Sequence, residues 1–148
     1  MAYDIQLNLP SEWQKEQSTY IDESEFEVTH VEAHLIRGKA EEGMVDIYVG
    51  EMPEDTNAED QAYSNYVDMV GFSDDDPEDF EPIFKVKFNG KPAFGFNALC
   101  ENDAPMVLLT QEVKQGVLAV MCFAALDDKK LEDTISLVEK SFRVKEQA

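Results

Sequence analysis

Two alternating stretches near the N-terminus predict β-strands. Apolar and polar residues alternate over Tyr3–Leu9, and Pro10 ends this period-two pattern, as expected of a half-buried strand. Phe26–Arg37 is ambiguous, because its apolar residues change parity partway along. A strand with a bulge explains the change, and a helix is the alternative. We favour a strand, because Gly38–Gly43 has the composition of a connection into a further alternating stretch, Met44–Tyr48.

A helical period follows. Thr56 and Glu59 have the spacing of a capping box, and Gly71 is a natural stop. Between them, apolar residues three and four apart form one stripe: Ala58, Ala62, Tyr63, Tyr66, Val67 and Val70. The pattern predicts an amphipathic helix over this segment.

A strand meander is predicted next. The strand patterns lie at Ile83–Phe88, Ala93–Glu101, Met106–Val113 and Val117–Ala124. Asn89-Gly90 is a strong hairpin-turn signal between the first two, and Gln115-Gly116 indicates a turn before the last. The last segment is almost continuously apolar, which favours a central strand covered on both faces.

The chain ends with a second helical pattern. It begins near Asp127 or Asp128 and places Leu131, Ile135, Val138 and Phe142 on one face, while the tail from Glu146 to Ala148 is expected to fray. Strands, a helix, an antiparallel meander and a helix indicate an α+β fold, with an antiparallel sheet flanked by helices. At 148 residues, without a linker or repeat, the chain is expected to form one domain, residues 1–148.

Charge narrows the classes of partner. A formal net charge of -20 repels nucleic-acid phosphates and anionic lipid head groups, so neither nucleic acid nor membrane is an expected partner. The longest apolar run, Val117–Leu126, is too short to cross a bilayer. The first ten residues lack the pattern of a secretory signal, and a cytoplasmic location is therefore expected.

The histidines and cysteines offer little chemistry by spacing alone. His30 and His34 would share a metal ion only on a helix, because on a strand they lie about 13 Å apart. No third ligand follows at a recognisable spacing, so no metal site is predicted. Cys100 and Cys122 fall in apolar strand patterns, where burial makes a thiol inert, and they are interpreted as reduced core residues.

Catalytic motifs are missing from the sequence. It contains no glycine-rich phosphate loop, no G-x-S-x-G elbow and no H-E-x-x-H helix, so we predict a noncatalytic protein without a cofactor. Trp13 has two interpretations, an exposed binding residue or a plug of the core, and the second is favoured.

The acidic residues are unevenly distributed. Residues 41–81 contain fifteen Asp or Glu and no Lys or Arg. The densest part is the candidate partner-binding segment: Asp74, Asp75, Asp76, Glu78, Asp79 and Glu81. It lacks the glycine and the terminal glutamate of a calcium-binding loop. Two interpretations remain, a surface for a basic protein partner and a face that only keeps the protein soluble.

The order of elements resembles a known family. Leu9-Pro10-Ser11-Glu12-Trp13 is similar to the LP-x-x-W opening of PsbP-like domains, and Asn89-Gly90-Lys91-Pro92-Ala93 before a strand fits the rest of their pattern. The resemblance covers nearly the whole chain and implies a PsbP-like α/β/α sandwich. It also implies a noncatalytic role in binding other proteins, and no residue role is carried over.

The leading hypothesis is therefore a noncatalytic protein-binding or adaptor domain whose acidic surface meets a basic partner. One alternative is a cytosolic chaperone for apolar segments of secreted or membrane proteins, which would need an exposed apolar patch. The other is a small-molecule binder, which would need a deep pocket with a few convergent polar groups.

Overall fold

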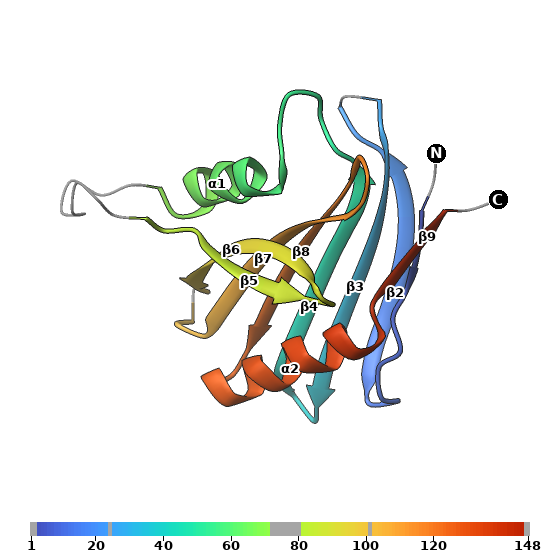
Figure 1. The fold of residues 1–148 in the computed structure, drawn as a ribbon. Helices are drawn as coiled ribbons and strands as arrows, with labels where there is room; N and C mark the ends of the chain where they lie inside the picture. The colour runs from blue at the N-terminus through green and yellow to red at the C-terminus, as the bar shows by residue number, and fades with distance from the viewer. Residues whose placement is uncertain (1–2, 24, 72–80, 101, 147–148) are drawn as a thin grey trace.

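A computed structural model describes residues 3–23, 25–71, 81–100 and 102–146 (Figure 1). Within them, a seven-stranded sheet dominates, and every neighbouring pair of its strands is antiparallel. In spatial order the strands are β2 (Trp13–Ile21), β3 (Glu27–Arg37), β4 (Ala40–Glu51), β8 (Val117–Ala125), β7 (Pro105–Lys114), β6 (Lys91–Leu99) and β5 (Phe84–Phe88).

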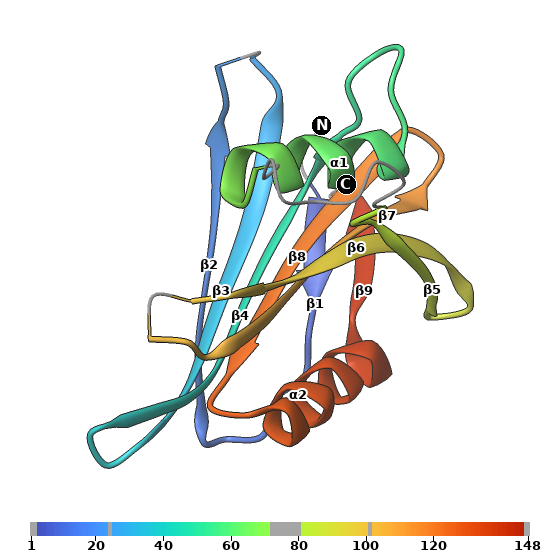
Figure 2. The same cartoon turned by 90° about the vertical axis from the view of Figure 1, so that its left-hand side faces the viewer.

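The two faces of this sheet are covered differently. Helix α2 (Asp128–Ser141) and a two-stranded ribbon of β1 (Tyr3–Gln6) and β9 (Arg143–Glu146) pack on one face. Helix α1 (Ala58–Met69) lies on the other face, where it contacts β6 and β7 (Figures 1 and 2). Among the described residues, the larger hydrophobic cluster lies on the α2 side.

The main hydrophobic core lies between the sheet and the layer of α2, β1 and β9. Alternate residues of β3, β4 and β8 point into it and are buried. The ring of Phe88 packs at a tilt against those of Phe123 and Phe142, with centroids 6.4 and 6.2 Å away. Trp13 is partly buried against this core, which confirms its interpretation as a core plug. A smaller cluster of Tyr66, Phe96 and other apolar residues lies under α1.

Both predicted helices are present, with two corrections: the cap of α1 differs, and α2 ends at Ser141, so that Phe142 has an extended backbone after the helix. Asp127 caps α2 by accepting a hydrogen bond from the Lys130 N–H at 2.8 Å. In α1 the cap is Asn57, not the predicted Thr56, and its side chain accepts from the Asp60 N–H. An Asn side chain reaches the same unpaired amides as Thr does, and it lies one residue closer to the helix.

The apolar stripe predicted for α1 is only partly buried. Ala58, Ala62 and Tyr66 are buried, whereas Val67 and Val70 are about half exposed. The helix therefore rests on the sheet along the line of Ala58, Ala62 and Tyr66, and the predicted stripe is wider than the buried face. Gly71 ends it as predicted, with a positive φ of 78° and its N–H donating to Tyr66 O.

The predicted strands and the Asn89-Gly90 turn are confirmed, since both turn residues have positive φ. The segment at Phe26–Arg37 is a strand, although the register shift lies at its end, between Leu35 and Ile36. Strands β2 and β9 went unpredicted. Glu146, the first residue of the tail expected to fray, pairs with Tyr3 of β1, whereas residues 147–148 lie outside the described residues. Strand β2 has a polar sequence at the sheet edge, so the hydrophobic pattern carries no signal for it.

The architecture confirms an α+β fold built on an antiparallel sheet. In the part of the chain that the structure describes, neither helix has the length and apolar character that crossing a membrane requires.

Candidate functional site

The candidate site lies on the sheet face that carries α1. Among the described residues, α1 packs chiefly on β6 and β7, whereas side chains of β8, β4 and β3 that point to the same face remain partly exposed. We call this partly exposed area the open face. Its side chains alternate with the core residues and are His30, Glu32, His34, Asp46, Tyr48, Val120 and Cys122.

A cleft of about 520 Å³ lies between the open face and α1. Its floor is formed by apolar side chains of β3, β7 and β8, including Val28, Leu108, Leu118 and Val120. Tyr20 and Phe26 border it on the β2–β3 side, and Met69 borders it on α1. The predicted central strand β8 is thus covered on its core face, while its second face forms part of this cleft.

The charges that line the cleft have one sign. Asp22, Asp46 and Glu51 contribute carboxylates, and among the described residues the lining includes no Lys, Arg or His. Gln61 and Asn65 add amide groups from α1. The cleft therefore combines an apolar floor with an acidic border.

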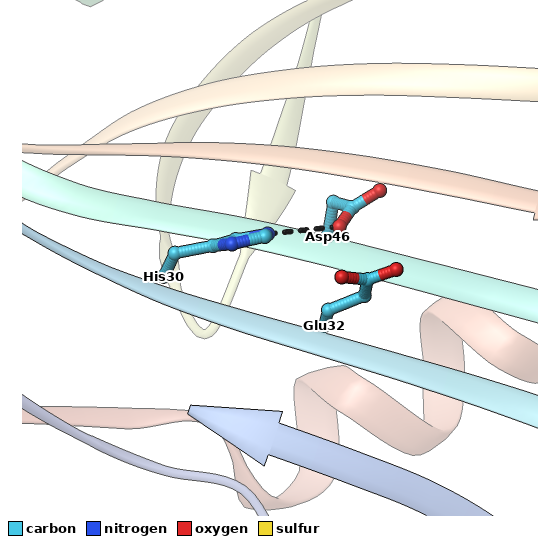
Figure 3. Close-up of side chains that lie close together, drawn as sticks. All are labelled: His30, Glu32 and Asp46. Carbon is cyan, nitrogen blue, oxygen red and sulfur yellow. Dashed lines mark hydrogen bonds and ion pairs between the residues drawn. The ribbon is translucent and has the colours of Figure 1, made fainter. Parts of the chain in front are cut away.

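A cluster of histidines and carboxylates lies beside the cleft. His30 donates from Nε2 to Oδ1 of Asp46 across 2.9 Å, and the two side chains are about one-fifth exposed. His34 donates from Nε2 to Oε1 of Glu32 across 2.7 Å, and from Nδ1 to Glu41. Figure 3 shows His30, Glu32 and Asp46 converging from two adjacent strands.

Strand geometry explains this convergence. His30, Glu32 and His34 are two residues apart on β3, so all three point to the same face. Register then places Glu32 opposite Asp46 of β4, and His30 opposite Tyr48. The His30 and Tyr48 rings are stacked, with centroids 4.2 Å apart and planes 2° from parallel.

The surroundings shift several pKa values. The hydrogen bond from His34 lowers the pKa of Glu32. Burial alone would lower the pKa of His34, but its bonds to Glu41 and Glu32 together outweigh burial and raise it. Burial raises the pKa of Tyr48, and it raises the pKa of the Cys122 thiol to about 12. Cys122 is therefore held as a neutral thiol, and a thiolate nucleophile is disfavoured.

The residues singled out by sequence have different outcomes. Asp74, Asp75, Asp76, Glu78 and Asp79 lie outside the described residues, whereas Glu81 is exposed shortly before β5. Cys100 and Cys122 are free, partly buried thiols. His30 and His34 lie on one face of a strand, as the strand interpretation requires.

Sequence reasoning missed the partners of these histidines. The pattern His30-x-Glu32-x-His34 could have indicated three polar side chains on one strand face. Asp46 could not be found in this way, because its position opposite Glu32 depends on the register between β3 and β4.

Comparison with known proteins identifies no relative of this chain. No protein-family model, curated protein or solved structure gives a significant match to the chain.

Proposed function

We propose that this chain is a noncatalytic binding protein whose cleft takes a small apolar ligand carrying a positive charge. The observation that supports this most is the cleft itself. Its volume of about 520 Å³ falls in the range of roughly 300–1,000 Å³ found for small-molecule sites, and such sites combine an apolar lining with a few polar groups.

The charge of the ligand follows from the lining. Asp22, Asp46 and Glu51 present carboxylates without a basic residue among the described lining, so an anionic ligand would meet only repulsion. Two unit charges about 4 Å apart interact by about 4 kcal/mol at the effective dielectric constant of a protein surface. A fraction of that energy is enough to select a cation.

The noncatalytic role is supported by the protonation state of the Cys122 thiol, which lines the cleft. A cysteine with a pKa of about 12 is protonated at neutral pH, so Cys122 contributes apolar surface to the cleft. The amides of Gln61 and Asn65 already donate to Thr56 Oγ1 and to Gln61 O, so they serve the helix as well as the cleft.

A matched pair of probes tests the proposal. Decylammonium and decanoate have the same chain length and opposite charge, and both are used below their micelle concentrations with chelator-treated protein. We expect saturable binding of decylammonium at least about tenfold tighter than that of decanoate, a difference of about 1.4 kcal/mol. Isothermal titration calorimetry measures both affinities.

Two variants separate the cleft from the general charge of the protein. Val120→Trp fills the floor and should abolish saturable decylammonium binding. Val86→Trp makes the same exchange at a 40% exposed position on β5, outside the cleft lining, and should leave binding unchanged. Equal binding by both variants would show that the net charge of -20, not the cleft, attracts the probe.

A protein partner with a basic surface is the second candidate, as an adaptor of the PsbP-like kind would require. The observation that favours it is a group of exposed acidic residues on and just before α1: Glu54, Asp55, Glu59, Asp60 and Asp68. Complementary charge of this kind speeds association and selects partners.

For this candidate we expect a captured partner to be lost at about 0.5 M salt, because screening shortens the reach of surface charge to a few ångströms. A variant with Glu59→Gln, Asp60→Asn and Asp68→Asn should lose the same partner at low salt. The measurement is quantitative pull-down with wild-type and variant bait. A partner retained by both treatments would contradict an electrostatic interface.

A further inference from the structure

We propose that His30, Glu32 and Asp46 form a binding site for one divalent transition-metal ion of the zinc class. The site lies on the open face, where β3 and β4 run side by side (Figure 3). It does not depend on the proposed function, since of its three residues only Asp46 also lines the cleft.

The spacing of the ligand atoms fits a small ion. One nitrogen of His30 and one oxygen from each carboxylate all lie within 4.8 Å of one another. Tetrahedral zinc with bonds of about 2.0–2.1 Å needs its ligand atoms roughly 3.3 Å apart. His30 and Asp46, at 2.9 Å, are already near this separation, so Glu32 is the side chain that must move. Its side chain is 45% exposed, which leaves space for that movement.

Neighbouring side chains contact two of the three ligands. The parallel ring of Tyr48 fixes the plane of the His30 imidazole. His34 donates to Oε1 of Glu32 across 2.7 Å and is the outer partner of that carboxylate. Metal sites commonly have such outer partners, which fix the direction of each ligand. The proposed site therefore has a second layer of contacts as well as three ligands.

The ligand types select the ion. An imidazole favours zinc, iron, nickel or copper, whereas magnesium and calcium favour all-oxygen sites. Two carboxylates balance the charge of a divalent ion. The partly exposed position leaves room for water as a fourth ligand, which an open zinc site uses.

The alternative is a simple hydrogen-bonded pair. His30 and Asp46 satisfy each other without a metal, and a protein with a net charge of -20 attracts any divalent ion weakly over its whole surface. The test must therefore separate a defined site from general attraction.

The experiment uses the full chain without a histidine tag, stripped with a chelator and titrated with zinc chloride or magnesium chloride by calorimetry. We expect one equivalent of zinc to bind at least about tenfold more tightly than magnesium. Asp46→Asn and His30→Gln should each lower the zinc affinity at least about tenfold, which is the least that loss of an outer partner costs. Glu132→Gln removes a carboxylate from the exposed surface of α2 and should change nothing.

Several results would overturn the site. They are the absence of saturable one-to-one zinc binding, equal effects of Asp46→Asn and Glu132→Gln, or loss of binding in His34→Gln with binding retained in His30→Gln. Thermal unfolding in chelator verifies that each variant folds, and Glu32→Gln supplies a second ligand change at a more exposed position. X-ray absorption of the zinc complex should show one imidazole nitrogen among oxygen ligands. A first shell of oxygen alone would contradict the proposal.

Discussion

Gly95→Ala is expected to destabilise the protein by about 3 kcal/mol or more, because a methyl group there has no space. A Cβ at Gly95 would lie 2.0 Å from the Leu108 carbonyl oxygen and 2.7 Å from a methyl carbon of Leu109. The first atom belongs to the backbone of the neighbouring strand β7, so relief requires the two strands to move apart. Urea unfolding monitored by circular dichroism measures the loss.

Gly50→Ala is the matched control within the same sheet. A Cβ at that position would meet its nearest atoms at 3.3 Å, which a shift of a few tenths of an ångström relieves. The expected cost is below about 1 kcal/mol, as for a mildly tight site. Equal losses of stability in both variants would contradict the close approach of β6 and β7 at Gly95.

Phe123→Ala is expected to cost about 3–5 kcal/mol, the range for removing a large aromatic side chain from a core. Phe123 is fully buried on the central strand β8, and its ring centroid lies 6.4 Å from that of Phe88. Its neighbours across the two adjoining strands are Val45 and Val107. Rigid strands on both sides prevent the cavity from collapsing, so the upper half of the range is expected in urea unfolding.

Phe123→Leu separates the stability lost with side-chain volume from the stability lost with the aromatic ring. It keeps an apolar side chain at the position, and its cost should stay near or below about 1.5 kcal/mol. An alanine variant as stable as the leucine variant would show that this part of the core is loosely packed, contrary to the structure.

The sequence predicted the elements whose signals are local. The cap at Asp127, the stop at Gly71 and the Asn89-Gly90 turn each depend on residues within one turn of chain, and all three are present. The alternation of apolar residues likewise predicted most strands of the large sheet.

The two strands that were not predicted, β2 and β9, depend on pairing with other strands more than on a hydrophobic pattern of their own. Strand β2 lies at the sheet edge with mostly exposed side chains, so its hydrogen bonds to β3 hold it without a hydrophobic pattern. Strand β9 is formed by pairing with the far end of the chain, from Tyr3 to Gln6. The alternation near the N-terminus predicted β1, but four residues directly after a helix are too few to show that they pair with it.

Neither the cleft nor the cluster of histidines and carboxylates was predicted from the sequence. The cleft lies where α1, which packs chiefly on β6 and β7, meets side chains of β4 and β8, and this arrangement is a consequence of tertiary packing. The acidic run chosen from composition lies largely outside the described residues, while Asp46, near the start of the same acidic stretch, belongs to both the cleft and the polar cluster. Composition indicated that the surface charge is negative, and the register between β3 and β4 determined where the Asp46 carboxylate lies.

The most direct test of the cleft is to locate bound decylammonium by chemical-shift changes in the amide spectrum of the labelled protein. We predict saturable changes centred on Val28, Leu118 and Val120, with the α2 side of the sheet unaffected. The Val120→Trp variant should lose these changes. Shifts spread over all acidic surfaces, or retained in that variant, would contradict a ligand-binding cleft on the open face.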